Sequence, residues 1–136
     1  MDGEFYESED VYNKLINQLN LKNIIIFNEF VEDDKVPDFF SICNLVILPY
    51  KSATQSGVTQ LAMNYSKPML VTNVGGLPEI IDHDKDGYIS SIEPKEISKH
   101  ILNYFSDENN EIKMSAALSK KQHFYSWDHF TDEILK

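Results

Sequence analysis

The residues best suited to chemistry follow two predicted strands, and the first set leads into a predicted helix. This set is small and polar, and it comprises Thr54, Gln55, Ser56, Gly57 and Val58. The first N–H groups of a helix have no partners within the helix and carry the positive end of its dipole, and a glycine lets a ligand approach the backbone closely. The pattern therefore suits a phosphate or diphosphate. The alternative is that Thr54 or Ser56 only caps the helix.

The second set follows the next predicted strand, at residues 69–72. Gly75 and Gly76 lead into Pro78, which is well placed for a first helical turn, and Glu79 comes directly after it. In a parallel sheet the two strand ends open toward one crevice, where such sheets bind ligands. The two glycines alone would indicate only a tight turn.

The elements around these residues alternate between strand and helix. The apolar run at 45–48, bounded by Pro49, predicts a strand covered on both faces, which we expect to be central. Further strands are predicted at 23–28, 69–72 and 88–91. Helices are predicted at 9–20, 36–43, 56–65 and 95–105, with two more toward the C-terminus. The chain is thus predicted to be one α/β domain over residues 1–136, a Rossmann-like parallel sheet of about four strands flanked by helices.

Composition excludes several classes of protein. The chain has 136 residues, is 42% hydrophobic and carries a net charge of −10, so it can bury one core and would repel nucleic acid. No apolar run approaches the roughly 20 residues of a membrane span. The single cysteine cannot form an internal disulfide, and the acidic N-terminus does not resemble a signal peptide, so a cytoplasmic location is expected.

Three segments, in this order and spacing, resemble the C-terminal, donor-binding domain of retaining GT-B glycosyltransferases, the glycosyl transferases group 1 family. Residues 19–50 resemble a strand, loop, short helix and strand that ends in Pro49-Tyr50. Residues 64–90 resemble the next strand, a Gly-Gly-x-Pro-Glu loop and a final strand, and residues 124–136 resemble a closing helix with a tryptophan. The resemblance implies transfer of a sugar from a nucleotide diphosphate to an acceptor with retention. It implies no cofactor and no metal ion.

The chain departs from the family pattern at two places. Many members carry two glutamates separated by seven residues, and aligning Ala62 and Met63 with the family's Ala-Met pair puts Ala53 and Leu61 at those positions. No catalytic residue is therefore assigned. The family's first two strands, with an Arg and a Lys that hold the donor phosphates, lie upstream of anything present. We expect the chain to be inactive alone and to require a missing N-terminal acceptor domain, or to self-associate or rearrange its sheet at the exposed strand edges.

The resemblance also assigns the substrate-binding residues. The phosphates and sugar are assigned to Thr54, Gln55, Ser56, Gly57 and Val58, with Gly75, Gly76 and Glu79 in the second loop. The nucleobase pocket is assigned to Asn28, Phe30 and Val31, flanked by Tyr50. Glu79 would orient a hydroxyl or cap the helix.

One competing motif points to a non-catalytic binding or interaction module. The spacing of an EF-hand calcium loop is matched by Asp82, Asp84, Asp86, Gly87, Ile89 and Glu93. Its flanks are poor, because Pro94 follows at once and glycines interrupt the preceding segment. An acidic turn before the strand at 88–91 explains the same residues.

Overall fold

The computed structural model describes residues 8–124 and 134. They divide into two compact units, residues 1–37 and 38–136, and each unit is described by itself.

The first unit contains helix α1 (Glu9–Gln18), which begins after the N-cap residue Ser8. The Ser8 hydroxyl accepts a hydrogen bond from the Asp10 amide at 3.4 Å, and acidic residues in the first turn complement the helix dipole. The prediction of a helix here is confirmed, with an earlier end than expected.

The predicted strand at residues 23–28 does not form, so this prediction was wrong. A strand needs a neighbouring strand to pair its backbone groups, and no strand is described within this unit. Most apolar side chains of the segment are exposed instead, with Ile25 at 79% and Phe27 at 64%.

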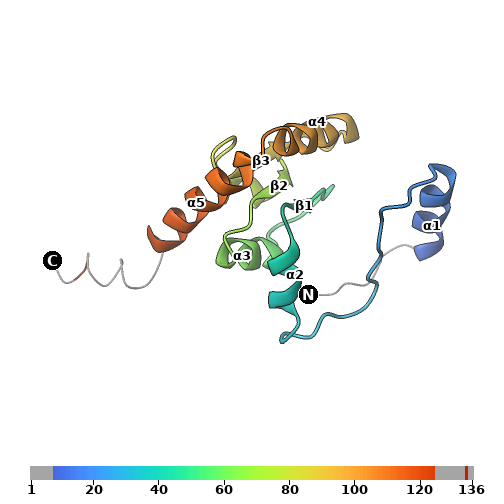
Figure 1. Ribbon diagram of the computed structural model, residues 1–136, viewed down its shortest axis with the longest axis horizontal. Helices are drawn as coiled ribbons and strands as arrows, with labels where there is room; N and C mark the ends of the chain where they lie inside the picture. The colour runs from blue at the N-terminus through green and yellow to red at the C-terminus, as the bar shows by residue number, and fades with distance from the viewer. Residues whose placement is uncertain (1–7, 125–133, 135–136) are drawn as a thin grey trace. The chain divides into compact units, whose positions relative to one another are not determined.

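The second unit is built on a parallel sheet of β1 (Val46–Leu48), β2 (Met69–Thr72) and β3 (Gly87–Ser90), in the order β1-β2-β3 (Figure 1). Leu48 pairs with Val71, and Thr72 pairs with Ser90. The α/β class is confirmed, but the sheet has three strands in the described residues. The central strand is β2 rather than the run at 45–48, because β1 pairs with β2 alone.

Five further helical segments are described after α1. They are α2 (Val36–Ile42), α3 (Gly57–Asn64), the 3-10 turn η1 (Leu77–Glu79), α4 (Pro94–Phe105) and α5 (Asn109–Phe124). Helix α4 packs on β3 and β2, and α5 contacts both α3 and α4. The last predicted helix falls mainly outside the described residues.

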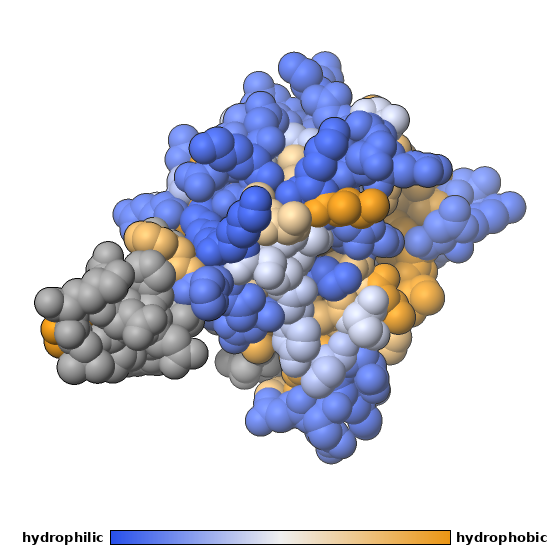
Figure 2. Space-filling model, turned by 60° about the vertical axis from the view of Figure 1, so that its left-hand side comes forward, coloured by the Kyte–Doolittle hydropathy of each residue, from blue (hydrophilic) through white to orange (hydrophobic). Residues whose placement is uncertain are grey.

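The core lies between β2 and the helices. All four residues of β2 are buried, and Leu70 joins Tyr88, Tyr104 and Met114 in one cluster. Most of the face in Figure 2 is hydrophilic, with hydrophobic residues gathered in patches. The carboxyl ends of β1 and β2 hold the two loops that the sequence singled out.

Candidate functional site

The two loops are locked together by their backbones. The Gly76 amide donates to the Thr54 carbonyl at 2.9 Å. Gly75 has a φ of 53°, and a Cβ atom there would collide with the carbonyl of Ala53. The left-handed backbone of Gly75 and its close approach to the Ala53 carbonyl both require glycine. This segment is therefore more than a tight turn.

Ser56 is the N-cap of α3. Its hydroxyl accepts from the Val58 amide at 3.3 Å and lies 3.4 Å from the Tyr50 hydroxyl. The Thr59 hydroxyl donates to the Ser56 carbonyl at 2.6 Å. Space beside Gly57 is open, because a Cβ atom placed there would meet nothing within 4 Å. A capped helix end with open space beside it still leaves room for a ligand.

A cavity of about 310 Å³ lies where the loops meet α3, a size typical of small-molecule sites. It is lined by Gln55, Ser56, Gly57, Thr59, Gln60, Gly76, Glu79 and Ile80. The structure therefore brings together five of the predicted residues from both loops.

Three lining residues were missed from the sequence. Thr59 and Gln60 lie three and four positions after Ser56, so helical spacing could have placed them on the same face. Ile80 follows Glu79 directly, and nothing in its type indicates a ligand.

The lining is rich in neutral hydrogen-bonding groups. The lining residues include the amide side chains Gln55 and Gln60, the hydroxyl side chains Ser56 and Thr59 and one carboxylate, Glu79, and no lysine is among them. Such groups suit a ligand with several hydroxyls. An anionic part of that ligand would depend on backbone amides and on the dipole of α3.

The other predicted residues support the loops or lie elsewhere. The Thr54 carbonyl accepts the bond from Gly76 that joins the two loops, Gly75 lies close to the Ala53 carbonyl, and the Val58 amide bonds the cap of α3. The residues assigned to a nucleobase pocket, Asn28, Phe30 and Val31, belong to the first unit. That assignment stays a prediction.

The acidic loop of the calcium motif is bound by a lysine. Asp86 is buried, and its carboxylate accepts from the Asp82 amide at 2.8 Å and from the Lys121 ammonium of α5 at 2.8 Å. Lys121 also donates to the Ile80 carbonyl at 2.6 Å and lies 3.3 Å from Asp82. Within residues 8–124 and 134 no three metal-binding side chains come together. The loop is thus tied to α5 by an ion pair, and the calcium interpretation gains no support.

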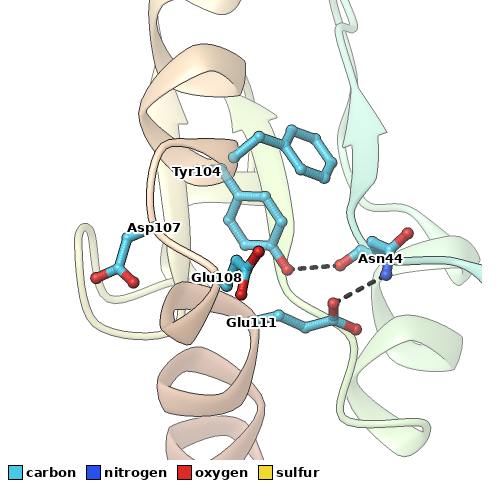
Figure 3. A pocket seen from close by; sticks show the side chains of 6 residues that line it. Asn44, Tyr104, Asp107, Glu108 and Glu111 are labelled. Atoms are coloured by element: carbon cyan, nitrogen blue, oxygen red, sulfur yellow. Dashed lines mark hydrogen bonds between the residues drawn. The ribbon is translucent and has the colours of Figure 1, made fainter.

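A second cavity, of about 230 Å³, lies where the α4–α5 turn meets Asn44 (Figure 3). The Tyr104 hydroxyl donates to the Asn44 carbonyl at 2.7 Å, and the Asn44 amide donates to Glu111 at 2.9 Å. These bonds join α4, α5 and the approach to β1. None of the residues predicted to bind a ligand lines this cavity.

Comparison with known proteins decides the family. The pattern of the family described as "Glycosyl transferases group 1" matches residues 6–122. The chain belongs to this family. It is 27% identical over 131 residues to an uncharacterised glycosyltransferase of Methanocaldococcus jannaschii, covering 95% of this chain and 34% of that protein. The chain therefore spans about a third of that relative's length.

Solved structures share the fold. The C-terminal domain of a glycosyl transferase group 1 family protein from Francisella tularensis superposes with a TM-score of 0.75 at 19% identity, covering 86% of this chain and 61% of that one. The protein HepE of Anabaena, solved in complex with UDP and glucose, gives a TM-score of 0.71 at 21% identity, with 93% of this chain and 35% of that one covered. The chain thus has the fold of a C-terminal GT-B domain. No helix in the described part of the chain is long and apolar enough to cross a membrane.

Proposed function

We propose that this chain forms the nucleotide-sugar site of a glycosyltransferase, which transfers a sugar from a nucleotide diphosphate to an acceptor with retention. The observation that carries the proposal is the cavity at the interlocked loops, at the carboxyl ends of β1 and β2, in a member of the glycosyl transferases group 1 family. HepE, crystallised with UDP and glucose, makes a uridine nucleotide the first ligand to test.

The diphosphate would lie at the start of α3, beside Gly57. A ligand could approach the backbone closely there, because Gly57 has no side chain to intervene. The helix dipole favours the negative charge that develops on the departing diphosphate. The sugar hydroxyls would face Gln55 and Gln60, and Glu79 would accept a hydrogen bond from one of them. Backbone dipoles would supply part of this stabilisation.

The net negative charge and the unpaired edge of β1 favour the interpretation that turnover needs a further polypeptide besides this chain. The net charge of −10 and a cavity without lysine leave the diphosphate poorly neutralised. In the described residues, β1 pairs on one edge only, and Ile47 in that strand is 37% exposed. Such an edge favours pairing with further strands, either of an acceptor-binding part or of a second copy. We therefore expect binding of the donor without turnover by the chain alone.

Titration calorimetry with UDP-glucose, GDP-mannose and ADP-glucose tests the site. We compare the parent chain with Gly57→Trp, which places an indole at the cavity from a position where a Cβ atom meets nothing within 4 Å. Ser98→Trp, on the exposed face of α4, is the matched control. Saturable binding of one nucleotide sugar, lost in Gly57→Trp and kept in Ser98→Trp, is expected. Binding that survives in Gly57→Trp would place the ligand elsewhere.

Incubating the chain with a radiolabelled nucleotide sugar, with and without an acceptor sugar, tests the proposal that the chain alone binds the donor without turnover. Release of free sugar or of a glycosylated product by the chain alone would refute the statement that it does not turn over.

A further inference from the structure

The hydroxyl of Thr72 makes a buried link between the two loops of the site. Thr72 is the last residue of β2 and is fully buried. Its hydroxyl donates to the Tyr50 carbonyl at 2.6 Å, with the Leu48 carbonyl 3.5 Å away. Its own carbonyl accepts from the Val74 amide at 2.8 Å, where the glycine loop begins.

This side chain extends the contact between β1 and β2 beyond the end of their ladder. The paired residues of the two strands end at Leu48 and Val71, and Pro49 follows. The Thr72 hydroxyl then holds the next residue, Tyr50, against β2. The link is therefore specific to a residue with a short hydroxyl side chain at this position.

The link continues from Tyr50 to the cavity. The Tyr50 hydroxyl lies 3.4 Å from the Ser56 hydroxyl, which caps α3 by accepting from the Val58 amide. The backbone of Tyr50 is thus fixed by Thr72, and its ring meets the cap of the helix that lines the cavity.

We propose that Thr72 is a positioning residue, which sets the start of α3 relative to the glycine loop and so shapes the donor cavity. The inference rests on the proposed function for its ligand. Thr72 does not line the cavity itself, so its effect passes through Tyr50 and Val74.

Thr72→Val and Thr72→Ser test the proposal. Valine keeps the shape and removes the donor, whereas serine keeps the hydroxyl. The matched control is Ser90→Ala, which removes a buried hydroxyl at the register partner of Thr72 on β3, where it bonds only the neighbouring Ser91 carbonyl. All variants are studied well below their melting temperatures, where each is folded.

Two readouts are taken on each variant. UDP-glucose affinity is expected to fall by up to about tenfold in Thr72→Val, because ordering the loops without this hydrogen bond draws its free energy from ligand binding, and to stay near the parent value in Thr72→Ser and Ser90→Ala. The backbone amide resonances of Gly57 and Gly76 in ¹⁵N NMR spectra are expected to move in Thr72→Val and to stay in place in the other two.

The readouts separate the two proposals. If the parent chain does not bind the nucleotide sugar, the proposed function fails, and the amide resonances still decide whether Thr72 positions the loops. Resonances and affinity in Thr72→Val that match those of Ser90→Ala would overturn the positioning role.

Discussion

Lys121 allows a quantitative prediction, because it is the cationic partner of a buried carboxylate. The side chain of Asp86 is 3% exposed and that of Lys121 is 16% exposed, with 2.8 Å between them. Replacing Lys121 by methionine keeps the apolar part of the side chain but leaves the Asp86 charge with only the Asp82 amide as a partner. Removing one partner of a buried ion pair costs about 3–5 kcal/mol. Since Lys121 reaches some solvent, we expect the free energy of unfolding to fall by about 3 kcal/mol.

Urea unfolding followed by circular dichroism measures this loss. For a domain of this size the slope is about 1–3 kcal/mol per molar urea, so the midpoint should fall by about 1–3 M. Lys120→Met, one residue earlier on α5 and exposed, is the control and should change little. The double variant Asp86→Asn, Lys121→Met should recover most of the loss, because asparagine removes the unpaired charge and still accepts from the Asp82 amide. A double variant as unstable as Lys121→Met alone would refute the reasoning.

The same pair gives a pH dependence. Burial by itself lowers the pKa of Lys121, but the hydrogen bond and charge of Asp86, assisted by Asp82, outweigh burial and raise the pKa above its ordinary value. The folded state therefore holds this proton more tightly than the unfolded state. The stabilisation is fully present below the unfolded pKa of about 10.4 and is lost as the pH rises through the folded value. The parent should lose stability above about pH 10 more steeply than the double variant.

Three further predictions concern single residues. Gly75→Ala should lower the free energy of unfolding by more than about 2 kcal/mol in urea titration, because of its φ and the collision with Ala53, whereas Gly57→Ala should be neutral or stabilising. Burial, together with the nearby charge of His83, lowers the pKa of His100. The contribution of His100 to the free energy of unfolding is therefore present above about pH 6.5 and is lost as the pH falls. The variant His100→Phe should flatten the dependence of the urea midpoint on pH between about 5 and 7. Tyr104→Phe removes the bond to the Asn44 carbonyl and should lower the melting temperature through a loss of about 1 kcal/mol; an unchanged melting temperature would contradict this.

Much of the fold followed from local patterns in the sequence. Short apolar runs predicted β1 and β2 to within a residue, because strands buried on both faces leave a continuous hydrophobic signal. The prediction of β3, which has no such run, agreed with the family resemblance. The start of α3 was predicted from Ser56 and Gly57, since capping depends on neighbouring residues alone. The same patterns failed at residues 23–28, where strand formation depends on a neighbour that is distant in sequence.

The sequence by itself determined the family, the order of the elements and the two loops that carry polar and glycine residues at strand ends. These features are local, or depend on the order of motifs along the chain. Only the tertiary structure decided how the loops meet, that Ile80 joins the cavity, and that Thr72 holds Tyr50. The tertiary structure also showed that Asp86 pairs with Lys121, 35 residues away, rather than belonging to a metal motif. The physical reason is that a buried carboxylate needs a cationic partner, and the packing of the helices decides which cation lies beside it. That packing cannot be predicted from the spacing of the acidic residues.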